Sequence, residues 1–224
     1  GLSSTPDWIG DDADQSGALF GKSVASAGDV NGDGYSDVII GASSYDGTNI
    51  NEGQTFVYYG SASGLSLLPD WVGDDANQDD AFSGVSVACA GDVNGDGYSD
   101  VIIGAHLYND GFTDEGVAFI YYGSSTGLPT SPNSTLDDAD QANTQFGVSV
   151  ACAGDINGDG YSDVIVGAWT YDDSGNNDEG RVFIYLGSAT GLSATPNDAP
   201  DDANQANAQF GISVASAGDV NGDG

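Results

Sequence analysis

Short apolar runs bounded by glycine set the pattern of this chain. Residues 23–28 read SVASAG and residues 37–42 read DVIIGA, and close copies of both return at 86–91 with 100–105 and at 149–154 with 163–168. Runs of this length that are bounded by Gly are typical of buried strands, and the second run is rich in β-branched residues. Each unit begins with a segment such as GLPTSPNSTL at 127–136 and ends with a third apolar run such as RVFIYLGS at 181–188. Helical periodicity is missing, so the sequence predicts four short strands per repeat.

Four strands in each unit of this length, stacked around an axis, predict an all-β fold, namely a β-propeller of four-stranded antiparallel blades. We expect a single repeat array over residues 1–224, with units 1–63, 64–126 and 127–190 and a partial unit 191–224. This amounts to about three and a half repeats and hence a partial propeller. Two copies joined head to tail would lack two strands at each joint. We therefore expect a piece of a longer repeat protein, or a fragment that self-associates through its open blade edges.

A polar loop separates the first two runs of every unit. It reads DVNGDGYSD at 29–37 and 92–100, DINGDGYSD at 155–163, and begins again at Asp219. Oxygen donors stand at positions one, three, five and nine, the Tyr carbonyl stands at position seven, and the glycines permit the tight curl that turns these groups inward. Oxygen ligands alone suit Ca²⁺ better than Mg²⁺. The predicted ligands are Asp29, Asn31, Asp33, Tyr35 and Asp37; Asp92, Asn94, Asp96, Tyr98 and Asp100; Asp155, Asn157, Asp159, Tyr161 and Asp163; and, in an incomplete fourth loop, Asp219, Asn221 and Asp223.

This loop has two alternative interpretations, an EF-hand and an Asx-rich turn. An EF-hand requires a glutamate at position twelve and flanking helices, whereas Ile40, Ile103 and Val166 occupy that position and strands flank the loop. An Asx-rich turn that binds nothing is the remaining alternative. Three intact copies argue against it, because each loop without a cation would crowd three carboxylates together.

The charge balance restricts the partners. The chain has 35 acidic residues and only two basic ones, Lys22 and Arg181, for a net charge of −33. This excludes nucleic acid and an anionic membrane surface as partners, and no apolar stretch approaches the roughly 20 residues of a membrane-inserted helix. Such repulsion favours surroundings rich in salt or divalent ions, so we expect a secreted or cell-surface protein, although a halophilic origin would give the same balance. Cys89 and Cys152 share one repeat position; free thiols are favoured over a disulfide.

The repeat resembles the FG-GAP repeat, the unit of the integrin α-subunit propeller and of many bacterial surface or secreted proteins. Phe20-Gly21, Phe146-Gly147 and Phe210-Gly211 match the FG element, while the second unit has Phe82-Ser83-Gly84. Gly41-Ala42, Gly104-Ala105 and Gly167-Ala168 match the GA of GAP, with Ser43, His106 and Trp169 in place of Pro. The resemblance covers the whole chain. It implies an antiparallel propeller, usually of seven blades, with Ca²⁺ in loops on one face.

Recognition is expected on the opposite face. A meander places the loops between the second and third strands there, and variable loops on a fixed scaffold are common recognition sites. We therefore expect a protein or glycan ligand near His106, Tyr108, Trp169 and Tyr171, with packing inside the blade as the alternative for the two tyrosines. Acidic segments at 11–15, 74–78, 137–141 and 201–205 would lie on the same face, as a solvated rim or as weak cation sites.

Catalysis is not expected. A catalytic constellation is singular, whereas nearly every polar residue here has a counterpart in the other units, and the chain has only one His and no Met. Repeated carboxylate pairs leave a glycosidase pair formally open. The sequence thus predicts a calcium-stabilised extracellular binding or adhesion module that is not an enzyme. The alternative is a non-catalytic structural or carbohydrate-binding portion of a larger secreted enzyme or self-assembling surface protein.

Overall fold

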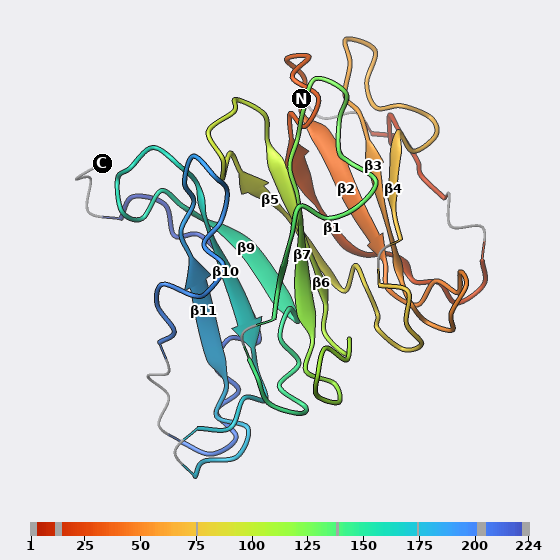
Figure 1. Ribbon diagram of the computed structural model, residues 1–224. Coiled ribbons are helices and arrows are strands. Elements are labelled where there is room, and N and C mark those ends of the chain that lie inside the picture. The colour runs from red at the N-terminus through yellow and green to blue at the C-terminus, as the bar shows by residue number, and fades with distance from the viewer. Residues whose placement is uncertain are drawn as a thin grey trace.

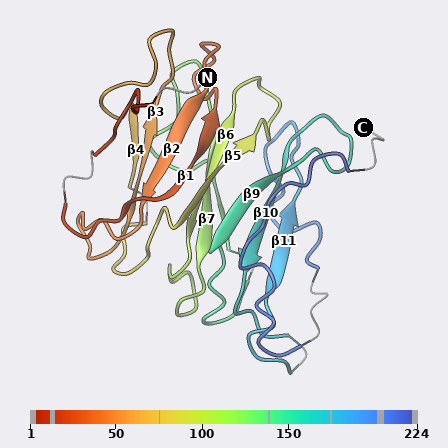
Figure 2. The same ribbon diagram turned by 180° about the vertical axis from the view of Figure 1, so that it is seen from behind.

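The computed structural model describes residues 4–11, 15–74, 76–137, 139–173, 175–200 and 205–220. Within these residues the secondary structure is entirely β, in three antiparallel sheets that stand side by side and do not close into a ring (Figures 1 and 2). The predicted all-β partial propeller is thus confirmed. In the described part of the chain there is no helix that is long and apolar enough to cross a bilayer.

Each sheet follows the chain order of its strands. The first sheet contains β1 (Phe20–Gly28), β2 (Asp37–Ala42), β3 (Gln54–Tyr58) and β4 (Trp71–Gly73). The second contains β5 (Ser86–Gly91), β6 (Asp100–Ala105), β7 (Val117–Tyr121) and β8 (Ser134–Leu136). The third contains β9 (Ser149–Gly154), β10 (Asp163–Ala168) and β11 (Arg181–Tyr185). The first strands of the sheets are neighbours, because β1 packs against β5 and β5 against β9.

The third sheet differs from the expected four strands. In place of a fourth strand, only a single bridge joins Ile184 to Asp198. Pro200 stands where β8 has Leu136, and a proline cannot donate a hydrogen bond to the ladder. Residues 213–218 repeat the SVASAG sequence of residues 23–28 but form no strand in the structure.

The hydrophobic cores lie between neighbouring sheets. Every residue of β6 is buried, and its side chains alternate between two cores. Val101 and Ile103 join the core shared with the first sheet, whereas Ile102 joins the core shared with the third. Because residues 101–103 face cores on both sides of the sheet, this stretch is apolar throughout, which explains the continuous run that marks the second strand of each unit.

Glycines allow the sheets to approach one another near the first strands. A Cβ added to Gly104 would overlap the carbonyl oxygen of Gly147 in the next unit, and one added to Gly41 would overlap that of Gly84. Within the second and third units, the N–H groups of Gly84 and Gly147 also donate to the carbonyls of Gly104 and Gly167, in each case at 3.0 Å. The GA and FG elements of neighbouring units thus form one backbone-to-backbone contact, for which only glycine is small enough.

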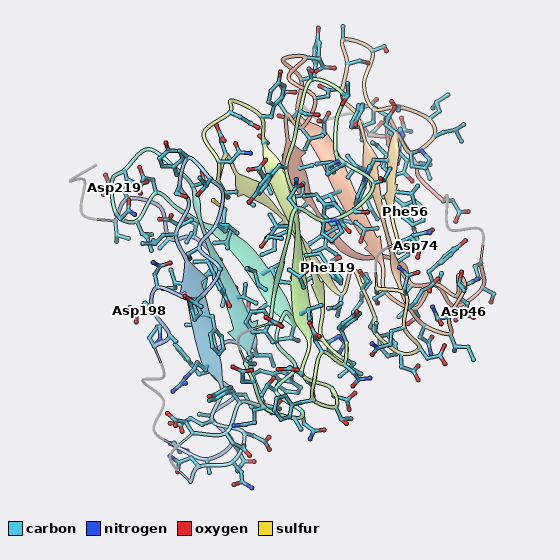
Figure 3. The ribbon with its side chains drawn as sticks, in the orientation of Figure 1. Asp46, Phe56, Asp74, Phe119, Asp198 and Asp219 are labelled. Atoms are coloured by element: carbon cyan, nitrogen blue, oxygen red, sulfur yellow. The ribbon has the colours of Figure 1, made fainter. Side chains whose placement is uncertain are left out.

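The loops gather at two opposite ends of the sheets. The β1–β2, β5–β6 and β9–β10 loops lie at the upper end in Figure 1, and the β2–β3, β6–β7 and β10–β11 loops lie at the lower end. Figure 3 shows the same separation, with Asp219 at the first end and Asp46 at the second. We call these the ion-loop end and the variable-loop end.

Candidate metal centres

The first predicted metal loop, residues 29–36, joins β1 to β2. Gly32 and Gly34 have φ angles of 73° and 90°, which side chains other than glycine rarely allow. This curl lets one Asp29 oxygen accept hydrogen bonds from the N–H groups of Gly32 at 2.8 Å and Asp33 at 3.0 Å, while the other accepts from Gly34 at 2.8 Å. The carboxylate at position one therefore points into the centre of the loop.

The side chains at positions three and five contact each other. Asn31 Nδ2 donates to Asp33 Oδ2 at 3.2 Å, and Asn31 Oδ1 accepts from the Asp33 N–H at 3.0 Å. Asp33 Oδ1 in turn accepts from the N–H of Tyr35 at 2.9 Å. The structure thus brings the side-chain oxygens of positions one, three and five, which are the predicted metal ligands, to the same side of the curled backbone.

Position nine is occupied by a fully buried carboxylate. Asp37 has no exposed surface, and its two oxygens accept from the N–H of Val30 at 2.9 Å and that of Gly60 at 2.8 Å. Gly60 belongs to the turn after β3, so Asp37 ties this turn to the metal loop. Burial raises the pKa of Asp37; the two N–H groups oppose this rise, and the nearby charges of Asp29 and Asp33 add to it.

The second and third loops repeat this arrangement closely. Hydrogen bonds equivalent to those of positions one, three and five recur with donor–acceptor distances between 2.6 and 3.1 Å. Asp100 and Asp163 are again fully buried and bridged to the turn after the third strand. Burial raises the pKa of Asp163 and raises that of Asp100 to about 7. In the fourth loop Asp219 is described and exposed, whereas Asn221 and Asp223 lie outside the described residues.

The donor chemistry of the loops fits a hard divalent cation. No group of three or more His, Cys, Asp and Glu side chains in the described chain forms a ready metal cluster. However, the donors here include an Asn and a backbone carbonyl, and a carboxylate oxygen that accepts one N–H keeps a second lone pair. In the first loop, the Asp29, Asp33 and Asp37 carboxylates, with the Asn31 amide and the Tyr35 carbonyl, would supply an oxygen-only site of the kind that Ca²⁺ prefers.

The four residues predicted for ligand contact lie at the variable-loop end and are half-buried. Tyr108 packs edge-to-face against Phe119 with ring centroids 5.9 Å apart, and Tyr171 packs in the same way against Phe183 at 6.0 Å. These contacts lie within a single sheet. Arg181 also stacks over the Tyr171 ring at 4.5 Å.

His106 and Trp169 each contact the residue that precedes the FG position. His106 faces the ring of Phe82 at 5.8 Å, and its Nδ1 is buried without a hydrogen-bond partner. Trp169 Nε1 donates to Gln145 Oε1 at 2.9 Å. Phe82 and Gln145 both have positive φ angles, so the aromatic of the second unit sits on a turn while Ser83 takes the position of Phe146.

The glutamates were not singled out as site residues, yet all three form one repeated feature. Glu52, Glu115 and Glu179 are at most 1% exposed and close the loops at the variable-loop end. Glu52 accepts from the N–H groups of Thr48 at 2.8 Å and Asn49 at 3.1 Å. Glu115 accepts from the Phe112 N–H at 3.2 Å, and burial raises the pKa of its carboxyl group. The available sequence signal was that the chain has no other Glu and places each one directly before a Gly.

The acidic segments between units pair with the variable loops. Gln15 and Gln78 each exchange two hydrogen bonds with the backbone of a loop 31 residues further on, at Asp46 and Asn109. Gln141 bonds Asp172 in the same way. Residues 12–14, 75, 138 and 201–204 of these segments lie outside the described chain. The glutamines thus anchor the variable loops.

Comparison with known proteins matches the FG-GAP repeat to residues 20–59, 84–121 and 146–185. The chain is 32% identical over 222 residues to integrin alpha pat-2 of Caenorhabditis elegans, covering 92% of this chain and 17% of that protein. It is 36% identical over 160 residues to integrin alpha-4 of Xenopus laevis, covering 70% and 15%. It is 35% identical over 167 residues to integrin alpha-V of Gallus gallus, covering 71% and 16%. The chain therefore spans about a sixth of the length of these relatives.

The matched segments coincide with the repeated structure. Each one contains the first three strands of a sheet together with the metal loop between the first two. The contact between the GA glycine of one unit and the FG glycine of the next recurs between successive units. The expected resemblance is confirmed, and the chain belongs to the FG-GAP repeat family.

Proposed function

We propose that this chain is a β-propeller module that is stabilised by Ca²⁺ and acts by binding rather than by catalysis. The observation that carries the proposal is the complete burial of Asp37, Asp100 and Asp163, each with two further carboxylates in its own loop. Backbone N–H groups alone offset part of this repulsion. When bound, Ca²⁺ supplies the positive charge that three neighbouring carboxylates lack in a chain with only two basic residues.

The expected gain in stability is large. A ligand that binds only the folded chain adds RT ln(1 + [Ca²⁺]/Kd), or about 2.7 kcal/mol per site at a hundredfold excess over Kd. Because the position-nine carboxylate also bonds the turn after the third strand, a cation in the loop would fix three of the four strands of that sheet. We infer that Ca²⁺ makes the ion-loop end rigid and leaves the variable-loop end free for recognition.

The binding role rests on the repetition of the polar residues and on the relatives. Three of the matched proteins are integrin alpha chains, so we propose a cell-surface or secreted adhesion module. The variable-loop end is the proposed contact surface for a protein or glycan. His106 and Trp169 differ between units, and Ser43 occupies the same position in the first unit. They are therefore the residues at which one unit could be distinguished from another.

Calorimetric titration with CaCl₂ tests the metal proposal directly. We expect saturable binding at the three complete loops and a higher melting temperature in CaCl₂ than in EDTA, with a smaller effect of MgCl₂. Equal melting temperatures in CaCl₂ and EDTA would refute the proposal.

The binding surface needs a second experiment. Cells or a glycan array can be probed with the Ca²⁺-loaded chain and with the His106→Ser and Trp169→Ser variants, which copy the first unit. Binding that neither variant weakens would place recognition elsewhere.

A further inference from the structure

Successive metal loops are joined by direct hydrogen bonds. Ser99 stands between Tyr98 and Asp100, the predicted ligands at positions seven and nine of the second loop. Its N–H donates to the Asp29 carbonyl at 3.0 Å, and its Oγ accepts from the Asp29 N–H at 3.1 Å. Asp29 is the predicted first ligand of the first loop. One serine therefore links the ligand segment of one loop to the first ligand residue of the preceding loop.

The backbone hydrogen bond of this link recurs between the second loop and the third. The N–H of Ser162 donates to the Asp92 carbonyl at 2.9 Å. A Cβ on Gly91 would overlap the Ser162 hydroxyl, just as one on Gly28 would overlap that of Ser99. These glycines leave room for the serine of the next unit, so the contact is part of the repeat and not an accident of one pair.

The tyrosine rings add a second contact at each junction. A Cβ on Gly32, between the ligands Asn31 and Asp33, would overlap the ring of Tyr98, and one on Gly95 would overlap the ring of Tyr161. The carbonyl of each of these tyrosines is a predicted ligand of its own loop. A shift of Gly32 would therefore be transmitted through the Tyr98 residue to the donor set of the second loop.

We propose that the three loops bind Ca²⁺ with positive cooperativity, because each cation orders the neighbouring loop through the Ser99–Asp29 and Ser162–Asp92 contacts. This inference rests on the proposed Ca²⁺ binding. A cation at the first loop fixes Asp29 and thereby Ser99, so the second loop loses less conformational freedom when it binds its own cation. The coupling is reciprocal, and the second loop must strengthen the first by the same factor.

Two variants that keep the same number of complete loops test the coupling. Asp92→Asn with Asp96→Asn disables the second loop and leaves two separated loops, whereas Asp155→Asn with Asp159→Asn disables the third and leaves two adjacent loops. In calorimetric titrations with CaCl₂, the adjacent-loop variant is expected to bind roughly 5-fold more tightly or better, with a Hill coefficient above one. Equal affinities and a Hill coefficient of one in both would overturn the proposal.

A matched pair of serine variants then tests the link itself. Ser99→Ala in the adjacent-loop variant removes one hydrogen bond of the junction but no ligand, and it is expected to lower the affinity toward that of the separated loops. Ser36→Ala is the control, because Ser36 holds the same loop position but is exposed. Equal affinities of the two serine variants would overturn the proposal. If Ser99→Ala does not fold in EDTA, as judged by circular dichroism, the proposal is tested by the comparison of the adjacent-loop variant with the separated-loop variant alone. Failure of the unaltered chain to bind Ca²⁺ would instead refute the proposed function.

Discussion

An exposed and a buried residue among the predicted ligands of one loop should respond differently to loss of their charge. Asp96 is exposed, and the side chain of an Asn at this position would still accept the hydrogen bond from the Tyr98 N–H, which is 3.1 Å long. In EDTA we therefore expect Asp96→Asn to change the free energy of unfolding by less than about 0.5 kcal/mol. Asp100 is buried, and its two oxygens accept from the N–H groups of Val93 at 2.8 Å and Gly123 at 2.9 Å. An Asn has only one acceptor oxygen, so Asp100→Asn should cost about 1–3 kcal/mol in EDTA.

Ca²⁺ adds the same loss to both variants. At a hundredfold excess over Kd, losing one site removes about 2.7 kcal/mol. For a chain of this size that corresponds to a fall in melting temperature of roughly 5–11 °C relative to the unaltered chain in CaCl₂. Urea unfolding followed by circular dichroism, in EDTA and in CaCl₂, measures both terms. The reasoning is wrong if Asp96→Asn loses the same free energy in both buffers, or if Asp100→Asn loses nothing in EDTA.

Three further changes test the scaffold. Burial lowers the pKa of His106 from 6.5 to about 4. The stability that the neutral imidazole contributes is therefore complete above pH 6.5 and is lost as the pH falls toward 4, by at most about 3 kcal/mol. His106→Ser should reduce the change of the unfolding free energy with pH over this range, and an unchanged pH profile would contradict this. Gly104→Ala should destabilise by about 1–3 kcal/mol because its Cβ meets the Gly147 carbonyl, as denaturant unfolding would show. Cys89→Ser should be nearly neutral in thermal melts, because Cys89 Sγ accepts from the Gly91 N–H at 3.3 Å as Ser26 Oγ accepts from the Gly28 N–H at 3.1 Å. Both cysteines are free in the structure, so thiol titration should find two free thiols, and Cys89 should react slowly because burial raises its pKa; a disulfide would contradict this.

The strands that carry the metal loops could be predicted because their signals are local. The run SVACAG at 86–91 coincides with β5, and DVIIGA at 100–105 coincides with β6. After Asp100, every residue of β6 is apolar or small and buried, so this pattern can be recognised without knowledge of the neighbouring strands. The inward orientation of Asp29 is equally local, because its hydrogen-bond donors lie within five residues of it.

The outer strands depend on contacts that no single segment reveals. The ring of Trp71 lies over Gly73 and packs against Tyr121 of the next sheet, with centroids 4.9 Å apart. In the next unit Ser134 takes the tryptophan position and Leu136 takes the glycine position, and Leu136 is 1% exposed. Each pair supplies one large apolar group and one small residue, but from opposite ends of the segment. Compared position by position, the two segments look unrelated. In the structure, however, each places one large apolar side chain in a hydrophobic core.

The contacts between successive metal loops could not be predicted from the sequence of a single repeat. The loop pattern predicts a backbone ligand at position seven, so it assigns a role to the tyrosine carbonyl but none to the tyrosine ring. Its ring contacts a glycine in the preceding unit: Tyr98 covers Gly32 and Tyr161 covers Gly95, but Gly158 has no neighbour within 4 Å at this position. The same glycine thus has two roles, a positive φ within its own loop and free space for the ring of the next. Periodicity makes the first role visible in every copy, whereas the second belongs to pairs of copies. The contacts from which we infer coupling between the loops are therefore visible in the structure and not in the repeat unit alone.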